Sequence, residues 1–203
     1  MSKKTTATKE PSKKDSPKLD SAKQPLKPNE TEHLFQNGDF YRGEFEEKKK
    51  HGKGTYTFKN GDVFEGEFFE GLFHGTGIYT FANGDKYVGD WQEGQKIGKA
   101  VFYFKNGDRF EGKYKENSPN GKGVFYFVNG EKYEGKFGKG MFNGKGTFYY
   151  KNGDKYEGEW ENDKKNGNGI YYFNDGIILE GEWENDIYKF PEPENKEKRR
   201  REL

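Results

Sequence analysis

The sequence contains no cysteine, and this absence excludes disulfide bridges and thiolate metal sites. A composition without cysteine fits an intracellular protein. The chain also lacks any apolar run of about 18 residues and any apolar N-terminal stretch that resembles a signal peptide. We therefore expect a soluble, non-secreted protein.

Aliphatic core formers are scarce. Only 29% of the residues are hydrophobic, yet 18% are aromatic, so rings make up more than half of the apolar residues, and 29 glycines accompany them. This composition disfavours a compact core of Leu, Ile and Val. We expect the buried surface to come from rings packed along an elongated structure.

Charge is balanced over the whole chain but not along it. Residues 1–30 contain eight Lys and four acidic residues, and residues 189–203 contain six basic and four acidic residues. The remaining body, 31–188, contains 22 basic and 27 acidic residues. This distribution argues against nucleic-acid binding and restricts contact with anionic membranes to the two basic tails.

Residues suited to catalysis or metal binding are also sparse. His51 and His74 lie at equivalent places beside predicted turns, which indicates a structural role. The Asn-Gly-Asp triplets lack the ligand spacing and the closing Glu of an EF-hand loop, and no glycine pair has P-loop spacing. We predict no catalytic residues, no cofactor and no metal, and hence a non-enzymatic protein.

What the sequence does contain is a repeat of 23 residues. An Asn-Gly-acid signal recurs at this period without insertion or deletion, and its seventh copy is a degenerate Asp175-Gly176. Because the period is strict, the seven units must stack in register. The glycines of the first six signals are Gly38, Gly61, Gly84, Gly107, Gly130 and Gly153.

Each unit contains two predicted strands. An aromatic-x-Gly-x-aromatic segment follows the turn, as at 156–160, and a Gly-x-Gly-x-aromatic-x-aromatic segment comes next, as at 144–150. Both alternate with period two, which is typical of β-strands, and the Asn-Gly pair predicts a type I′ hairpin turn. The predicted fold is all-β: an elongated antiparallel β-hairpin repeat array, a meander ribbon of about 14 strands and roughly 65 Å.

Glycine and aromatic residues share one face of each predicted strand. A glycine within a strand loses stability unless a neighbouring group covers it, and a ring from an adjacent strand can provide that cover. We therefore assign a structural role to the central glycine of the first strand in each unit, namely Gly43, Gly66, Gly89, Gly112, Gly135, Gly158 and Gly181.

The opposite face is polar but carries a row of tyrosines: Tyr103, Tyr126, Tyr149 and Tyr172. One interpretation is a solvated face held by cross-strand pairs, each worth well under about 1 kcal/mol. The other is that this row binds a partner protein, because clustered exposed aromatic residues favour interfaces.

The segments Tyr-Glu-Gly-Glu-Trp at 156–160 and His-Gly-Lys-Gly-Thr-Tyr at 51–56 resemble MORN repeats, named for membrane occupation and recognition nexus. The resemblance divides the chain into a disordered basic tail at 1–33, seven MORN repeats at 34–188 and a charged C-terminal tail at 189–203. Two departures are that Ala100 replaces one glycine and that Leu179 weakens the last unit, as expected of a terminal cap.

The resemblance implies a non-catalytic structural scaffold that binds other proteins. The chain looks most like the axonemal and radial spoke head members of the family, which consist largely of repeats. This implies axonemal or other cytoskeletal partners and localisation in the cytoplasm and cytoskeleton, within the axoneme of a cilium or flagellum. Two alternatives stay open: a membrane-associated tether that binds anionic phospholipid, and an adaptor for an enzyme. A homodimer also stays open, because open sheets leave unpaired edge strands.

Overall fold

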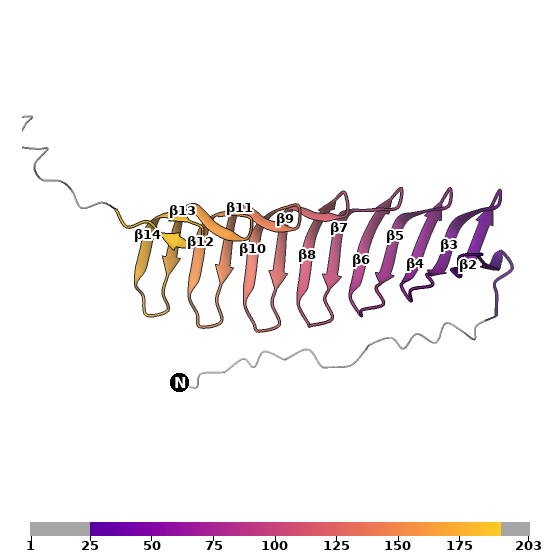
Figure 1. Ribbon diagram of the computed structural model, residues 1–203, viewed down its shortest axis with the longest axis horizontal. Helices are drawn as coiled ribbons and strands as arrows, with labels where there is room; N and C mark the ends of the chain where they lie inside the picture. The colour runs from indigo at the N-terminus through magenta and orange to yellow at the C-terminus, as the bar shows by residue number, and fades with distance from the viewer. Residues whose placement is uncertain (1–24, 192–203) are drawn as a thin grey trace, which may run out of the picture.

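The structure is a computed structural model that describes residues 25–191, so most of both predicted tails lies outside the described residues. The described chain forms a single sheet in which each of fifteen strands pairs antiparallel with the next strand along the sequence. This confirms the predicted all-β meander of hairpin repeats (Figure 1). The strands are β1 (Glu30–Leu34), β2 (Phe40–Glu46), β3 (Lys49–Thr57), β4 (Val63–Phe69), β5 (Leu72–Thr80), β6 (Lys86–Gln92), β7 (Gln95–Tyr103), β8 (Arg109–Lys115), β9 (Ser118–Tyr126), β10 (Lys132–Gly138), β11 (Met141–Tyr149), β12 (Lys155–Glu161), β13 (Lys164–Tyr172), β14 (Ile178–Glu184) and β15 (Ile187–Tyr188).

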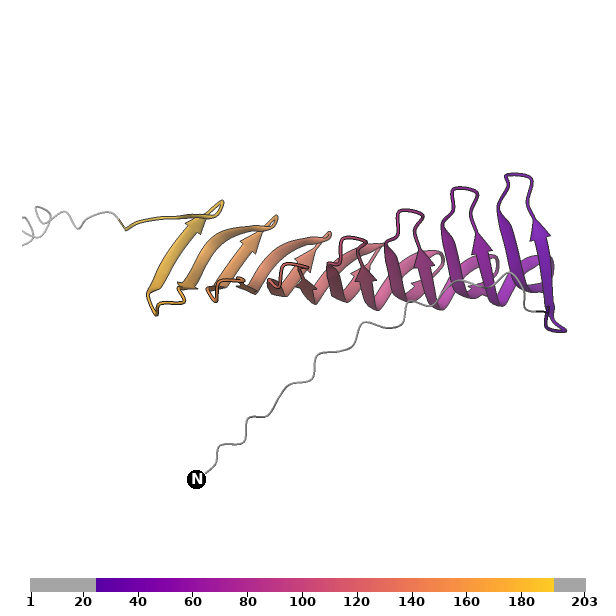
Figure 2. The same ribbon diagram turned by 90° about the horizontal axis from the view of Figure 1, so that it is seen from below.

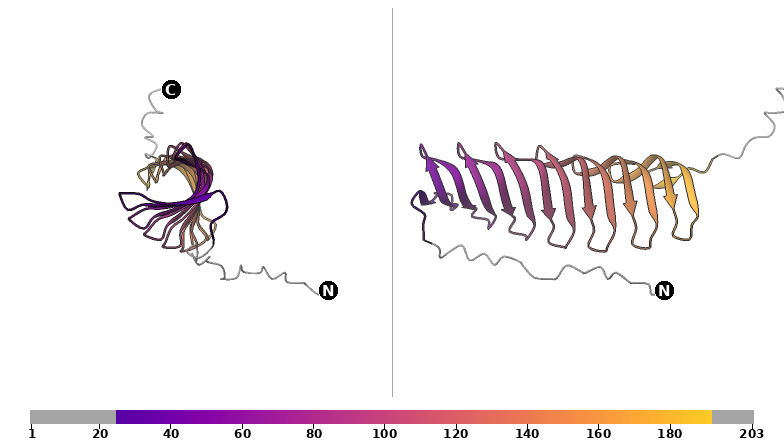
Figure 3. Two further views of the ribbon diagram at one scale, coloured as in Figure 1. Left: turned by 90° about the vertical axis from the view of Figure 1, so that its right-hand side faces the viewer. Right: turned by 180° about the vertical axis from the view of Figure 1, so that it is seen from behind.

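The sheet is a long open ribbon. Its strands follow one another along the long axis from β2 at one end to β14 near the other (Figure 1), and the turns gather along the two long edges (Figure 2). Seen along that axis, the sheet is an open crescent (Figure 3, left). Each unit therefore contacts only its neighbours, as in other repeat proteins.

The fourteen expected strands are β2 to β15, and β1 is an addition that crosses the predicted tail boundary at residue 33. The sheet therefore begins at Glu30, inside the segment predicted to be a disordered tail. The polar sequence of β1 has no strand pattern, yet a hairpin turn at Asn37-Gly38 requires a strand on each side. β1 supplies backbone partners to β2, and Arg42 of β2 lies 3.8 Å from Glu30 and 3.7 Å from Glu32.

The predicted type I′ geometry of the Asn-Gly turns is wrong. In the turn after β3, Gly61 has a positive φ of 94°, but Asn60 does not have a positive φ. The Gly61 amide donates to the Phe58 carbonyl, and the Phe58 amide donates to the Asp62 carbonyl, both at 2.9 Å. This pattern is a type I turn followed by a left-handed glycine. The Asn60 side chain fixes it by accepting a hydrogen bond from the Asp62 amide at 3.0 Å.

Two positive φ angles in succession, as a type I′ turn requires, occur at the opposite edge of the sheet. Between β2 and β3, Glu47 and Lys48 have φ values of 46° and 65°. Shortly after this turn, Gly52 has a φ of 56° and lies where the pairing of β2 with β3 shifts register. Such a bulge bends its strand and increases the local twist, which fits the curvature of the ribbon.

A continuous row of small residues crosses the sheet. From β4 to β12, the central glycine of each first strand pairs with a small residue on both neighbouring second strands, as Gly135 does with Gly123 and Gly146. At the two ends, Gly43 pairs with Gly54 and Gly181 pairs with Gly169. Ala100 is the one non-glycine member of this row. The row contains the seven glycines assigned a structural role, Gly43, Gly66, Gly89, Gly112, Gly135, Gly158 and Gly181.

Candidate interaction surfaces

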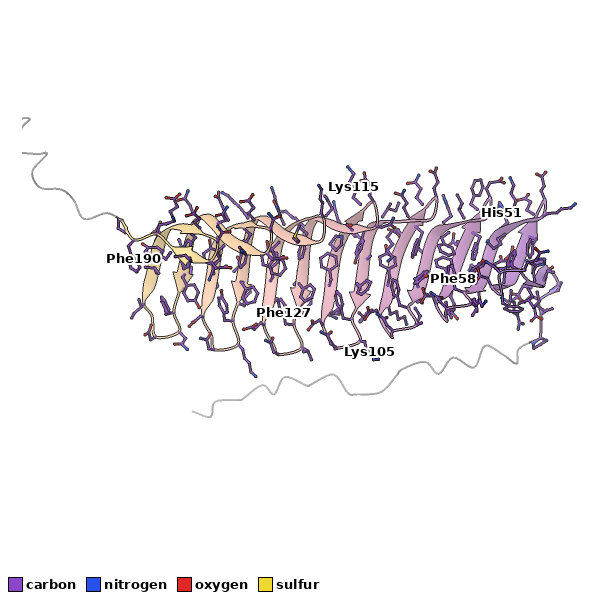
Figure 4. All side chains as sticks on the ribbon, viewed as in Figure 1. His51, Phe58, Lys105, Lys115, Phe127 and Phe190 are labelled. Atoms are coloured by element: carbon purple, nitrogen blue, oxygen red, sulfur yellow. The ribbon has the colours of Figure 1, made fainter. Side chains whose placement is uncertain are left out.

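The two faces of the sheet differ in chemistry, and all side chains are drawn in Figure 4. We name the side with the buried rings the aromatic face and the opposite side the polar face. Six rings of the aromatic face come from equivalent positions in six units, and each of them has an exposed fraction of at most 2%: Tyr41, Phe64, Tyr87, Phe110, Tyr133 and Tyr156.

These six rings lie directly over the glycine row. A Cβ atom built on Gly146 would lie 2.2 Å from the hydroxyl oxygen of Tyr133, and one built on Gly77 would lie 2.5 Å from the ring of Phe64. The absence of a side chain at the glycines is therefore what allows each ring to lie against the backbone.

The buried tyrosine hydroxyls are satisfied by backbone. Tyr41 donates to the Glu44 carbonyl at 2.9 Å, and Tyr156 donates to the Glu159 carbonyl at 3.2 Å. Burial, with a smaller contribution from Glu159, raises the pKa of Tyr156 to about 12. These phenols stay neutral at physiological pH and act as structural donors.

Aspartates of the Asn-Gly-Asp turns link successive turns along one long edge. Asp154 accepts hydrogen bonds from the Tyr171 hydroxyl and from the Asn174 amide, both at 2.9 Å. Asp39 is bound in the same way by the Tyr56 hydroxyl at 2.6 Å and by the Lys59 amide at 2.8 Å. Each of these carboxylates therefore ties one unit to the next.

These links make the stability of the array sensitive to acid. The hydrogen bond from Tyr56 and then that from the Lys59 amide hold the pKa of Asp39 below its usual value. The bond from Asn152 and then that from the Asn174 amide do so for Asp154. Because a lowered pKa stabilises the fold above the unfolded value of about 3.9, this contribution is lost as the pH falls through the folded-state pKa.

We therefore expect the urea midpoint to fall below about pH 4, and to fall less in Asp154→Asn than in the wild type. The measurement is urea unfolding followed by circular dichroism from neutral pH to pH 2.5. A matched control is Asp85→Asn. Asp85 lies at the position equivalent to Asp154 in another unit, where Phe102 replaces the tyrosine whose hydroxyl binds Asp154. An equal acid response in all three proteins would contradict the assignment.

The four tyrosines of the predicted row end alternate strands, β7, β9, β11 and β13. Tyr103 and Tyr149 have exposed fractions of 43% and 38%, and Tyr126 and Tyr172 are half-buried. Between them lie Arg109, Lys132 and Lys155, the first residues of β8, β10 and β12. The structure thus brings the four tyrosines and three cations into one row, which we name the Tyr–cation row.

Each cation of the row covers a tyrosine ring. The Arg109 guanidinium carbon lies 4.4 Å from the centre of the Tyr126 ring, the Lys132 nitrogen 4.3 Å from that of Tyr149, and the Lys155 nitrogen 4.2 Å from that of Tyr172. At these distances cation–π attraction holds the rings in place. The sequence interpretation overlooked these cations, although a basic residue lies two places after the glycine of four successive Asn-Gly signals, from Lys86 to Lys155.

The same cations pair with glutamates of their own strands. Arg109 lies 3.1 Å from Glu111, Lys132 lies 3.1 Å from Glu134, and Lys155 lies 3.1 Å from Glu157. All six side chains are substantially exposed, so each ion pair contributes little to the free energy of folding. Their regular placement instead gives the polar face a repeating pattern of ring, cation and carboxylate.

An open depression of about 650 Å³ lies beside the row on the polar face, over the glycines of β11 to β14. Its charged lining consists of Glu134, Glu157, Glu159, Glu180 and Lys145. The depression is open to solvent and lacks the enclosed apolar wall of a small-molecule site. It adds acidic contact area to the polar face.

The histidines lie in structural surroundings. His51 Nδ1 is 3.1 Å from Glu46 Oε2, and the His51 and His74 rings lie 5.2 Å and 5.5 Å from Phe69. Among residues 25–191, no group of three or more His, Cys, Asp or Glu side chains is placed to hold a metal ion. Nor does this part of the chain contain a helix long and apolar enough to cross a membrane.

Comparison with protein families gives one match. A model described as MORN repeat matches residues 41–63, 64–86, 87–109, 110–132, 133–155 and 156–178. These six segments cover more than half of the chain and follow its 23-residue period. The unit that starts at Leu179 lies outside the match, and its second strand, β15, has two residues. No curated protein sequence matches the chain significantly.

Solved structures show a weak likeness. The TCP domain of Sas-4 from Drosophila melanogaster in complex with a proline-rich motif of Ana2 aligns with a TM-score of 0.44 at 16% identity, covering 83% of this chain and 99% of that one. A second structure of this Sas-4 region, titled TCP10c domain, gives 0.43 at 14% identity, covering 76% and 99%. Likeness at this level supports no functional inference.

Proposed function

The chain belongs to the MORN repeat family, and from this membership we propose that it is a non-catalytic scaffold that holds other proteins along its polar face. MORN repeats themselves indicate a scaffold for protein or membrane interaction. The observation that carries the proposal is the Tyr–cation row, in which Tyr103, Tyr126, Tyr149 and Tyr172 are held at equivalent positions of successive units.

The geometry of the row suits an extended partner. Neighbouring tyrosines are two strands apart, or roughly 10 Å at the usual strand spacing. Cations pre-order the rings, so little side-chain entropy is lost on binding. A partner that crosses several strands can contact all four tyrosines, and such contacts add up along the row.

We further propose that the scaffold works in a cytoskeletal assembly, most specifically the axoneme of a cilium or flagellum, and there the radial spoke. Support comes from the uninterrupted array of strands in the described chain and from its resemblance to axonemal members of the family. The test is to express the tagged full chain in a ciliated cell and extract the cell with detergent. Retention in the demembranated axoneme supports this location, and complete release with the membrane fraction contradicts it.

The partner-binding role of the row makes a separate prediction. Replacing Tyr103, Tyr126, Tyr149 and Tyr172 together by Ser should weaken co-sedimentation with isolated axonemes by about tenfold or more, because interface tyrosines carry much of the binding free energy. Each lost cation–π contact removes only about 0.5–1 kcal/mol at an exposed site, so the array should remain folded.

The chain offers a matched control on the same four strands. Lys99, Lys122, Lys145 and Asn168 each lie four residues before one of the tyrosines. Changing these four to Ser should leave co-sedimentation close to wild type. Wild-type binding by the tyrosine variant, with its circular dichroism spectrum unchanged, would contradict the assignment of the row.

A membrane tether is the second candidate, and the basic ends of the sequence favour it. The excess of basic over acidic residues lies in 1–30 and 189–203, so binding to anionic vesicles should require these ends and should weaken with salt. Vesicle binding by the full chain that disappears when the ends are removed would support a tether. Binding that survives their removal would place lipid contact on the repeats instead.

A further inference from the structure

One position of the repeat covers the buried rings of the aromatic face. It lies near the start of the second strand of each unit, and its occupants are Lys50, Phe73, Lys96, Pro119, Phe142, Lys165 and Tyr188. Where the occupant is Phe, it stacks on the ring below it. Phe73 lies 3.9 Å from Phe64 at an interplanar angle of 20°, and Phe142 lies 3.7 Å from Tyr133 at 8°.

Where the occupant is lysine, its ammonium group lies among rings. Lys96 shows this most fully, with its nitrogen 4.7 Å from the centre of the Phe81 ring and 5.2 Å from that of Tyr87. The rings of Tyr79, Trp91 and Phe102 lie at 5.8, 5.8 and 5.9 Å. The side chain is partly exposed, so a ligand can reach the ammonium.

Lys50 and Lys165 are each influenced by the charge of a carboxylate that lies beyond ion-pair distance, and Lys96 is not. Asp39 acts electrostatically on Lys50, and Asp186 acts on Lys165. Among the described residues, no carboxylate forms a direct ion pair with any of the three lysines. Burial lowers the pKa of all three lysines, and only for Lys96 does no nearby acid oppose this effect. Burying an ammonium without a counter-ion costs free energy, and cation–π attraction to the surrounding rings offsets only part of that cost.

The sequence shows why the charge that acts on Lys165 is not matched at Lys96. The residue 21 positions after Lys165 is Asp186, and the residue 21 positions after Lys96 is Asn117. Both side chains accept a hydrogen bond from the lysine backbone amide at 2.9 Å. The backbone contact is therefore kept in the two units, while the negative charge is present in one of them only.

The surface next to Lys96 is apolar. The following occupant of the covering position is Pro119, so no stacked ring covers this stretch. Four phenylalanines lie partly exposed along it: Phe102, Phe104, Phe125 and Phe127. Figure 4 labels Phe127, the last of them. Phe102 and Phe125 replace the tyrosines that bind turn aspartates in earlier units. The middle of the aromatic face thus combines a strip of rings with the Lys96 ammonium, which has no carboxylate partner in the part of the chain that the structure describes.

We propose that Lys96 is the anchor of a binding site on the aromatic face for an apolar segment of a partner protein that carries one carboxylate. The carboxylate would form the missing ion pair in a partly desolvated place, where charge-assisted hydrogen bonds are strong. The apolar flank of the segment would cover the phenylalanine strip. This site rests on the proposed function in one respect, namely that the partner is a protein. The experiments below use the purified chain, so a failure of axonemal localisation would not contradict the site.

The proposal first predicts a gain of stability when the ammonium is removed. Lys96→Phe places a ring where Phe73 and Phe142 already stack, and it should raise the melting temperature of the full chain. Lys165→Phe is the comparison, and it should raise the temperature less, because the Asp186 carboxylate near Lys165 is left without its cation. A lower melting temperature for Lys96→Phe would mean that the lysine serves the fold, and this would overturn the proposal.

The second test measures binding of a defined probe, 4-phenylbutyrate, with 4-phenylbutyramide as the neutral comparison. Titrations are followed by two-dimensional NMR of the full chain. An acid of this size should bind with a dissociation constant on the order of a few mM. Asn117→Asp, which supplies the carboxylate that Lys165 has, should weaken binding about tenfold, and Lys96→Gln should do the same. Asp186→Asn should create a second site at Lys165.

The chemical-shift changes caused by the acid must be largest at Lys96 and the adjoining phenylalanines. The proposal would be overturned if the amide or inorganic phosphate bound as well as the acid, or if Lys96→Gln bound the acid as well as the wild type. It would also be overturned if the wild type showed no binding at an acid concentration about 20-fold above the expected dissociation constant.

Discussion

Gly135→Ala should destabilise the array by about 3 kcal/mol or more, whereas Gly146→Ala, directly opposite on the next strand, should cost about 1–2 kcal/mol. The two substitutions add the same methyl group to the same row. They differ in what the methyl group meets. A Cβ atom on Gly135 would lie 2.5 Å from the Tyr133 hydroxyl oxygen and also 2.5 Å from the Cα atom of Gly146, which is backbone and cannot move aside. The three nearest atoms to a Cβ on Gly146 all belong to the Tyr133 side chain, so no backbone atom is among the closest obstacles to the methyl group there.

The chain already contains a natural example of the milder case. Ala100 lies at the position equivalent to Gly146, pairs with Gly89 and has an exposed fraction of 7%. The second-strand positions of the row therefore accept a methyl group, whereas a Cβ on Gly89 would lie 2.5 Å from that of Ala100. Gly135→Val, with two further methyl groups, should be worse than Gly135→Ala.

Thermal and urea unfolding of the three variants measure these differences. A control in the same strand is Gly138→Ala, where a Cβ atom would be 3.3 Å from the flexible Asn143 side chain. It should change stability by less than about 1 kcal/mol. An unchanged melting temperature for Gly135→Val would refute the packing of rings against the glycine row.

The period of the sequence was sufficient to predict the meander, because a strict 23-residue repeat with alternating residues admits few other arrangements. The turn type was not predictable from Asn-Gly alone. The side chain of Asn60 holds the amide of Asp62, and this contact keeps the asparagine out of the left-handed conformation. β1 escaped prediction because its residues are polar, and its role is to pair with the edge of β2.

The candidate sites were predictable in part. The tyrosine row follows from alternation on the polar face, but its cation cover depends on which residues pair across strands, as Lys132 does with Tyr149. The environment of Lys96 depends on three-dimensional contacts with five rings from four strands or turns. Only the change from Asp186 to Asn117 was visible in the repeat alignment, and its meaning required the structure.

Phe64→Ala should cost about 3–5 kcal/mol, the range for removing a fully buried large ring. Phe64 has no exposed surface, stacks on Phe73 at 3.9 Å and meets Trp91 edge-on at 5.3 Å. Its loss would open a cavity between β4 and β5 and uncover the glycines beneath it. Phe69, in the same strand, has an exposed fraction of 53%, and Phe69→Ala should cost less than about 1 kcal/mol.

A double-mutant cycle gives the sharpest test of this packing. Two ring atoms of Phe64, each 2.5 Å away, are the nearest obstacles to a Cβ on Gly77, and the next is Trp91 at 3.3 Å. Gly77→Ala should therefore destabilise the wild type by about 1–2 kcal/mol but should be neutral or stabilising in Phe64→Ala, where the methyl group partly fills the cavity. Such a sign reversal requires that ring and glycine occupy one shared space. If the two effects simply add, the ring does not lie over Gly77, and the burial of six rings along the glycine row would need another explanation.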